Sequence, residues 1–280
     1  MRERENRLRP ENRQPQQDEF LIAATPTLSA MPLLQGLRKH PRVDLVLQSA
    51  DSVCSLLDDG LVDAALVPAF ELQRDEKSVT VLGAGCVSCS GTSFAARIYS
   101  YAPARGVRAV WADPEARTAS ALAQVIWAYD FNHTLEVLPL EAGPRRSIGN
   151  DEGILVIENE VVSRPPLGFD WQLDLCALWD HMTGLPFVSS VWAASNNADL
   201  VGLYQLLENA RRSGQKNLRK IATQCAPEIN WPEDLAIRFL EKHIDYEFGN
   251  AQRDGLEEFF HLCERLGLTH EFRPVQYYRP

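Results

Sequence analysis

An apolar strand near residue 190 constrains the fold of this chain more than any other feature. Residues 187–193 read Phe-Val-Ser-Ser-Val-Trp-Ala and follow a turn that contains Gly184 and Pro186. The stretch shows no regular alternation with charged residues, which is typical of a strand covered on both faces. A helix is expected over 173–182, directly before it. We therefore predict a buried strand late in an α/β chain, where the backbone passes from one lobe back to another.

Length and charge narrow the classes of protein to which the chain can belong. Its 280 residues predict about two domains. The net charge of −10 argues against a general nucleic-acid binder, which normally has a basic surface. No apolar run approaches the roughly 18 to 20 residues of a membrane span. Residues 1–18 are rich in Arg, Glu, Gln and Asn and lack an apolar signal core, so we expect a disordered tail and a cytoplasmic protein.

The order of the expected elements predicts an α/β fold. The first strands are expected over 20–24, 43–48, 61–68 and 79–82, with helices over 32–37 and 52–59. This order is typical of a parallel sheet with right-handed crossovers. Later strands are expected over 93–101, 107–112, 135–138 and 153–157, and later helices over 121–129, 199–213, 217–224, 232–243 and 255–266.

Two sheet-forming regions predict two α/β lobes around a cleft. We expect residues 19–101 and 196–280 to form the first lobe and residues 102–195 to form the second. The chain would cross between the lobes near 100–106 and return near 193–197. Two crossings make a hinge, and hinged lobes close around small ligands.

Three segments are candidates for ligand contacts. Residues 113–120 lead from a strand into a helix, whose N-terminus with Arg117 and Thr118 suits a carboxylate. An N-cap cluster with a surface arginine is an equally good interpretation. The small residues of 83–93 would let backbone amides approach a ligand, although a flexible connection is the simpler interpretation. Residues 25–29 follow the first strand and offer Thr27 and Ser29, either to a ligand or to the next helix as caps.

The cysteines do not predict a metal site. Cys86 and Cys89 form a lone CxxC pair, without the second pair or the nearby histidines that zinc requires. The remaining cysteines, expected mostly in helices or strands, are Cys54, Cys176, Cys225 and Cys263. We expect all six to be reduced thiols, since buried free cysteine is the default in a cytoplasmic protein.

Five segments, in order, resemble the chorismate dehydratase family of the futalosine pathway of menaquinone biosynthesis. The matching segments are 20–37, 56–72, 112–126, 178–194 and 239–260. The resemblance implies a two-lobed fold like that of type II periplasmic binding proteins. It implies the dehydration of chorismate to 3-[(1-carboxyvinyl)oxy]benzoate, without a metal or an organic cofactor. The implied partner is a small-molecule diacid, with no nucleic acid and no membrane.

The resemblance also implies a set of site residues. Ser29 and Thr92 are the predicted catalytic residues. Predicted substrate contacts come from Thr27, Ser90, Gly91, Ser93, Ala95, Arg117, Thr118 and Asn159. Departures from the family pattern occur at Ser29 for an asparagine, at Ala95 for a serine, at Ala116 and Ala119 for serines, and at Glu158-Asn159 for Gly-Asp. These departures leave two alternatives open, a relative that acts on another small carboxylated acid and a ligand-binding protein without catalysis.

Overall fold

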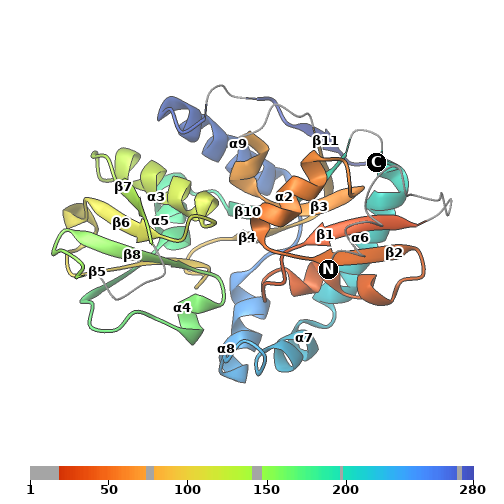
Figure 1. Ribbon diagram of the computed structural model, residues 1–280, viewed down its shortest axis with the longest axis horizontal. Coiled ribbons are helices and arrows are strands. Elements are labelled where there is room, and N and C mark those ends of the chain that lie inside the picture. Colours follow the sequence, from red (N-terminus) through yellow and green to blue (C-terminus); the bar gives the residue numbers. More distant parts are fainter. Residues whose placement is uncertain (1–18, 74–78, 141–146, 196–197, 270–272) are drawn as a thin grey trace.

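The chain folds into two α/β lobes that lie side by side (Figure 1). The computed structural model describes residues 19–73, 79–140, 147–195, 198–269 and 273–280. Each lobe is built on its own twisted sheet, of six strands in the first lobe and of five in the second. The predicted two-lobed α/β fold is therefore confirmed.

The sheet of the first lobe has the strand order β11-β4-β10-β3-β1-β2. Its strands are β1 (Phe20–Ala24), β2 (Val43–Leu47), β3 (Ala64–Pro68), β4 (Thr80–Cys89), β10 (Phe187–Ala194) and β11 (Gln276–Tyr278). Strands β1, β2 and β3 are parallel, as the β-α-β order predicts. Strand β10 runs antiparallel between β3 and β4 and is mostly buried, which confirms the predicted covered strand.

The sheet of the second lobe has the strand order β7-β6-β8-β5-β9. Its strands are β5 (Ala96–Ser100), β6 (Ala109–Ala112), β7 (Glu136–Pro139), β8 (Glu152–Ile157) and β9 (Trp171–Asp174). Strand β5 therefore belongs to the second lobe and β10 to the first. The boundaries that we predicted at 101/102 and 195/196 need correction, because the crossings lie at 90–95 and 184–186.

Strand β4 corrects the prediction of a loop over 83–93. The segment Gly-Ala-Gly-Cys-Val-Ser-Cys continues the strand to Cys89, and its residues 86–89 pair with β10, whereas β11 pairs with residues 80–82 earlier in the strand. Residues 83–85 lie at a shift in the pairing register with β10, so the small residues form an irregularity inside a strand that is paired on either side of them. At Gly85, whose φ is +154°, an added Cβ would meet the Leu33 side chain at 3.0 Å and the Tyr246 carbonyl at 3.2 Å. A glycine there lets neighbouring segments approach the sheet closely.

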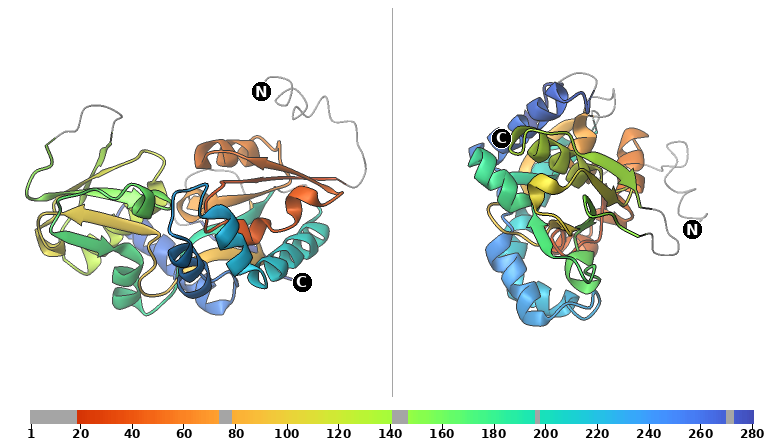
Figure 2. Two further views of the ribbon diagram at one scale, coloured as in Figure 1. Left: turned by 90° about the horizontal axis from the view of Figure 1, so that it is seen from below. Right: turned by 90° about the vertical axis from the view of Figure 1, so that its left-hand side faces the viewer.

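The helices cover the faces of both sheets (Figure 2). They are α2 (Ala50–Asp58), α3 (Arg117–Tyr129), α4 (Glu160–Ser163), α5 (Leu175–Thr183), α6 (Leu200–Gln215), α7 (Leu218–Cys225), α8 (Glu233–Arg238) and α9 (Asn250–Arg265). The helix predicted over 32–37 consists of two short 3-10 turns, Met31–Leu34 and Leu37–Lys39. Another 3-10 turn, Ala69–Gln73, follows β3, and a π-helical turn, Phe239–His243, extends α8.

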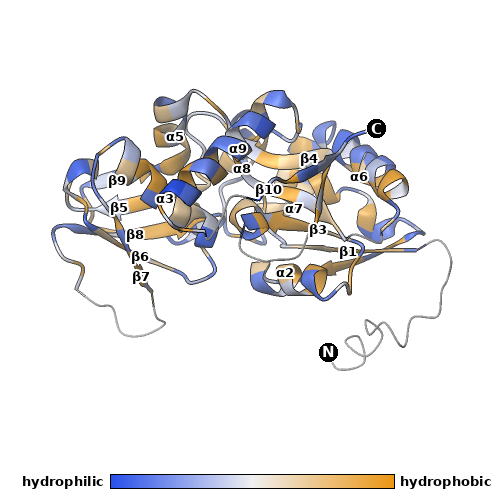
Figure 3. Ribbon diagram, turned by 90° about the horizontal axis from the view of Figure 1, so that it is seen from above, coloured by the Kyte–Doolittle hydropathy of each residue, from blue (hydrophilic) through white to orange (hydrophobic). Residues whose placement is uncertain are grey.

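An aromatic cluster packs the region where the chain returns to the first lobe. The rings of Trp179, Phe187 and Phe259 meet edge to face, with centroids 5.2 to 6.1 Å apart. They come from α5, β10 and α9, so one cluster joins the last helix of the second lobe to the first lobe. Apolar residues occupy the strands while polar residues lie on the outer helix faces (Figure 3). Within the described part of the chain, no helix combines the length and apolar character needed to span a membrane.

Candidate functional site

The turn after β1 meets the corner after β8, and this contact joins the two lobes. Ser29 is 1% exposed, and its hydroxyl donates to Glu158 Oε2 at 2.9 Å. Thr27 Oγ1 lies 3.0 Å from Ser29 Oγ. The backbone N–H of Leu28 donates to Asn159 Oδ1 at 3.3 Å. Two hydroxyls, an amide and a carboxyl therefore converge from both lobes at the carboxyl ends of β1 and β8, the usual ligand position in open α/β sheets.

Glu158 holds an unusual backbone conformation at this corner. Its φ is +53°, in the left-handed region that residues with a side chain rarely adopt. Its N–H donates to the Ala95 carbonyl at 2.8 Å, which fixes the corner against the first crossing. Burial raises the pKa of the partly exposed Glu158 carboxyl to about 7, although the Ser29 hydroxyl acts in the opposite direction. The carboxyl can therefore both accept and release a proton near neutral pH.

Asn159 and Tyr246 complete the surroundings of Glu158. The Asn159 carbonyl accepts from Trp231 Nε1 at 2.8 Å, so the C-terminal helices also hold the corner. Tyr246 is 1% exposed, and its hydroxyl has no hydrogen-bond partner among the described residues. Burial, then the charges of Glu158 and Asp245, raise the pKa of the Tyr246 phenol well above its ordinary value. A buried hydroxyl without a partner is costly and is most common where a ligand or water supplies one.

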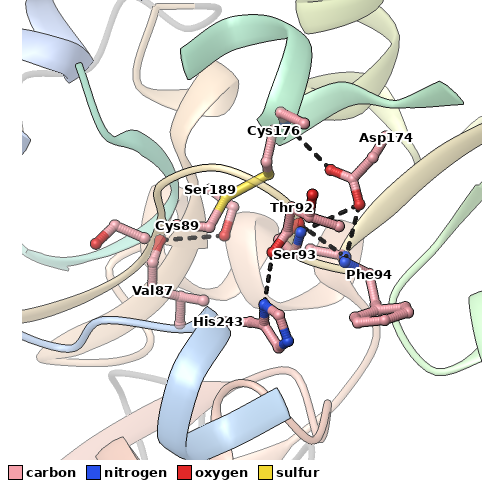
Figure 4. The surroundings of a disulfide bond; sticks show 12 residues. Val87, Cys89, Thr92, Ser93, Phe94, Asp174, Cys176, Ser189 and His243 are labelled. Atoms are coloured by element: carbon pink, nitrogen blue, oxygen red, sulfur yellow. Dashed lines mark hydrogen bonds between the residues drawn. A yellow bond between two sulfur atoms is a disulfide. The ribbon is translucent and has the colours of Figure 1, made fainter. Parts of the chain in front are cut away.

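The first crossing uses its backbone amides internally. The N–H groups of Ser93 and Phe94 both donate to Asp174 Oδ2 at 3.1 Å, and the Ser93 hydroxyl accepts from the Ala95 N–H. The Thr92 carbonyl contacts His243 Nδ1 at 2.6 Å. Figure 4 shows Asp174 facing the backbone of Ser93 and Phe94, next to a disulfide bond. These amides do bind a carboxylate, but the carboxylate is that of the chain's own Asp174.

The disulfide bond joins Cys89, at the end of β4, to Cys176, in the first turn of α5 (Figure 4). The expectation that all six cysteines are free thiols is therefore wrong for these two. Cys86 is free and donates to the Glu247 carbonyl at 3.4 Å, and burial raises the pKa of its thiol to about 12. In a strand, residues three apart point to opposite faces, so the CxxC pair cannot chelate one ion. Among the described residues, no cluster of His, Cys, Asp and Glu is arranged to hold a metal.

The N-terminus of α3 forms a second contact between the lobes. Arg117 Nε donates to Glu71 Oε1 at 2.6 Å, and its NH2 group pairs with Asp51. Burial lowers the pKa of Arg117, but hydrogen bonds to Asp51 and Glu71 outweigh it and hold the pKa above its ordinary value. Thr118 Oγ1 accepts from the Phe70 N–H at 3.2 Å. Both side chains thus contact the first lobe.

The predicted site residues therefore fall into three groups. Thr27, Ser29 and Asn159 lie together at the corner after β8, and Ala95 reaches it through its carbonyl. Arg117 and Thr118 form the second contact. The first crossing holds Ser90, Gly91, Thr92 and Ser93, of which Ser90 and Thr92 are exposed.

Sequence reasoning assigned no role to Glu158, Tyr246 or Asp174. The position of Glu158 at the end of a strand is the signal that would have identified it as a candidate. Asp174 and Tyr246 carry no comparable signal, because their roles depend on contacts with residues far away in the sequence.

Comparison with known proteins identifies the family and the fold of the chain. Residues 20–265 match the sequence model of a family described as "Menaquinone biosynthesis". The chain belongs to this menaquinone biosynthesis family. A chorismate dehydratase from Thermus thermophilus is 35% identical over 105 residues, which cover 37% of this chain and 36% of that protein. The chain thus spans about a third of the length of the curated relative that it matches.

Solved structures with the same fold have little sequence identity to this member of the family. The alkanesulfonate-binding protein SsuA from Xanthomonas axonopodis pv. citri has a TM-score of 0.67 at 13% identity, covering 94% of this chain and 99% of its own. A protein from Archaeoglobus fulgidus has a TM-score of 0.65 at 12% identity, and the match covers 90% of this chain and 99% of that protein. The periplasmic aliphatic sulphonate binding protein from Escherichia coli has a TM-score of 0.61 at 12% identity, and the match covers 91% of this chain and 94% of that protein. These likenesses confirm the fold of a periplasmic binding protein.

Proposed function

We propose that the chain is a chorismate dehydratase that acts in the cytoplasm. It converts chorismate to 3-[(1-carboxyvinyl)oxy]benzoate and water, in menaquinone biosynthesis by the futalosine route. The observation that carries the proposal is the 35% identity over 105 residues to a chorismate dehydratase, within a family match over 20–265.

The chemistry of this reaction fits the groups that meet between the lobes. Chorismate loses a proton and a hydroxyl from neighbouring ring carbons, and the ring becomes aromatic. The reaction therefore needs positioning and proton transfer, and no redox step. The hydroxyls of Thr27 and Ser29, the amide of Asn159 and the carboxyl of Glu158 offer donors and acceptors for both tasks.

Incubation of the purified protein with chorismate, followed by liquid chromatography with mass detection, tests the proposal. We expect a protein-dependent product that is one water lighter than chorismate and coelutes with 3-[(1-carboxyvinyl)oxy]benzoate. A parallel incubation without protein measures the spontaneous decay of chorismate. Chorismate that disappears no faster than in that control would show that the protein is not a chorismate dehydratase.

The departures from the family pattern at Ser29 and Ala95 favour a second candidate function, a binder of a small carboxylated aromatic acid that does not dehydrate chorismate. Arg117 is paired with Asp51 and Glu71, and a dianion such as chorismate would have to displace these carboxylates. Titration calorimetry combined with product analysis separates the two candidates. The binder would bind an aromatic acid without converting it, whereas the dehydratase would release water from chorismate. Ser29→Asn combined with Ala95→Ser restores the family residues, so a large rise in turnover would indicate a weakened dehydratase.

A further inference from the structure

Tyr246 approaches the corner after β8 from the first lobe, and the charge of Glu158 acts on its phenol. Its backbone is fixed to β4, because the Cys86 N–H donates to the Tyr246 carbonyl at 3.2 Å. A β-bridge between residues 88 and 245 lies directly beside this bond. Gly85 permits the close approach, since an added Cβ there would lie 3.2 Å from the Tyr246 carbonyl. The irregular part of β4 therefore places the Tyr246 ring in the interior, where it is 1% exposed.

The hydroxyl of Tyr246 differs from the two other hydroxyls near this corner. Ser29 donates its proton to Glu158 Oε2 at 2.9 Å, so Thr27 must be the donor in its 3.0 Å contact with Ser29. The Tyr246 hydroxyl is buried and has no hydrogen-bond partner among the described residues. Burial raises the pKa of this phenol well above its ordinary value, so it keeps its proton at neutral pH. A buried donor without a partner is costly and is most common where a ligand supplies the acceptor.

Glu158 provides an acceptor near this donor. One of its oxygens, Oε2, accepts from Ser29, and within the described part of the chain no side chain donates to the other oxygen, Oε1. A ligand carboxylate could accept from Tyr246, but an ionised Glu158 would repel it. A ligand hydroxyl can accept from Tyr246 and donate to Glu158 at the same time. The two side chains together therefore suit a hydroxyl better than a carboxylate.

We propose that Tyr246 and Glu158 form a hydroxyl-binding pair, which determines how a carboxylated ring acid lies between the lobes. Tyr246 donates to the oxygen of the ligand hydroxyl, and Glu158 accepts a hydrogen bond from the same hydroxyl without taking its proton. For chorismate this group is the ring hydroxyl, an assignment that rests on the proposed function. The family pattern has glycine in place of Glu158, so the dehydration itself does not depend on this carboxyl. The pair acts on the selection and orientation of the ligand.

Tyr246→Phe tests the proposal, because it removes the hydroxyl and keeps the ring. The test compares chorismate with its dehydration product, 3-[(1-carboxyvinyl)oxy]benzoate, which lacks the ring hydroxyl. Loss of one buried hydrogen bond typically weakens binding about 10-fold, so we expect KM for chorismate to rise by about that factor. The inhibition constant of the product should stay within about twofold of the wild-type value, because the product has no hydroxyl to lose a partner.

Tyr99→Phe is the matched control. Tyr99 is also 1% exposed, but its hydroxyl donates to the Val161 carbonyl at 3.2 Å. Its loss should lower the urea midpoint of the ligand-free protein and leave the ratio of the two ligand constants within about twofold of the wild type. Ligand-free Tyr246→Phe should be at least as stable as the wild type, because its hydroxyl has no partner in the free protein.

Glu158→Gly, which restores the family residue, tests the second member of the pair. It should keep kcat within about threefold of the wild type, because the reaction does not need this carboxyl. The preference for chorismate over the product should fall at least about threefold, because the acceptor for the ring hydroxyl is lost. The charge of Glu158 acts on both ligands, so the ratio of their constants reports the hydroxyl alone.

Four outcomes would overturn the inference. The first is a Tyr246→Phe variant with an unchanged preference for chorismate over the product. The second is equal weakening of both ligands, which would indicate a purely structural role. The third is a ligand-free Tyr246→Phe that loses as much stability as Tyr99→Phe, which would show that the Tyr246 hydroxyl is already paired in the free protein. The fourth is a wild-type protein that binds neither compound.

A wild-type protein that binds chorismate without dehydrating it would overturn the proposed function alone. The same comparison is then made with the dissociation constants of the two compounds from calorimetry. A loss of preference in Tyr246→Phe would still support the hydroxyl-binding pair, and an unchanged preference would still overturn it.

Discussion

The stability of the protein should depend on pH through Glu158, and this can be measured without any substrate. Glu158→Gln is the perturbation, because glutamine keeps the side-chain length and an oxygen that accepts the Ser29 proton. Glutamine does not titrate. Any pH dependence of the difference between the two proteins therefore reports the ionisation of Glu158.

The sign of the effect follows from the raised pKa. Burial raises the pKa of Glu158 from 4.5 to about 7 in the folded state. Below pH 4.5 the carboxyl is protonated in both states and adds nothing to the pH dependence. Between pH 4.5 and 7 the folded state binds more protons than the unfolded state, so the free energy of unfolding falls as the pH rises.

The magnitude follows from the same two values. Each pKa unit corresponds to about 1.36 kcal/mol, so the rise to about 7 gives an upper value of about 3 kcal/mol. Solvent at the partly exposed carboxyl screens part of this energy. We therefore expect Glu158→Gln to be about 2 to 3 kcal/mol more stable than the wild type at pH 8, and nearly equal to it at pH 4.5.

Urea unfolding at pH 4.5, 6, 7 and 8, followed by circular dichroism, measures this difference. Glu160→Gln controls for the loss of a glutamate charge at an exposed position of the same segment. The difference between the wild type and Glu158→Gln should grow with pH, whereas the control should follow the wild type. A difference of the same size at every pH would refute the reasoning, because it would show that Glu158 titrates normally in the folded state.

Three further predictions concern the contacts between and within the lobes. Gly255→Ala should lower the free energy of unfolding by about 1 to 3 kcal/mol in urea, because its methyl group would clash with the Pro186 carbonyl, while the exposed Asp254→Ala on the same helix should not. Arg117→Ala should cost about 1 to 3 kcal/mol in the same assay, since the half-buried guanidinium bridges two carboxylates, and an unchanged midpoint would contradict this. Cys176→Ser removes the disulfide bond and should lower the thermal midpoint by an amount equivalent to about 2 to 4 kcal/mol. Reduction with dithiothreitol should lower the midpoint of the wild type but not that of the variant, which has no disulfide bond to lose.

Local patterns in the sequence predict the elements of the first lobe well. The β-α-β order and the apolar strand over 187–193 both describe elements whose partners follow from burial and chain order. The lobe boundaries could not be predicted in the same way. Strand β5 resembles a continuation of the first lobe in the sequence, and only its pairing with β8 and β9 assigns it to the second. The glycines around Gly85 suggested a loop, and they do lie at a shift in the pairing register with β10, but pairing on either side of them keeps the segment within the strand.

The candidate site could be predicted only in part, because its chemistry arises from distant contacts. Ser29 was identified from its place after a strand, but its partner Glu158 lies 129 positions away in the sequence. Arg117 was expected near a helix start to bind the carboxylate of a ligand, but no local pattern shows that the chain's own Asp51 and Glu71 pair with it. Pairing between Cys89 and Cys176 likewise depends on how the two crossings lie in space, over a separation of 87 residues.

The position of the disulfide bond makes the second lobe a module with covalently joined ends. All five strands of its sheet, together with α3 and α4, lie between Cys89 and Cys176. A protease that cuts once within this segment therefore yields two fragments that stay linked until they are reduced.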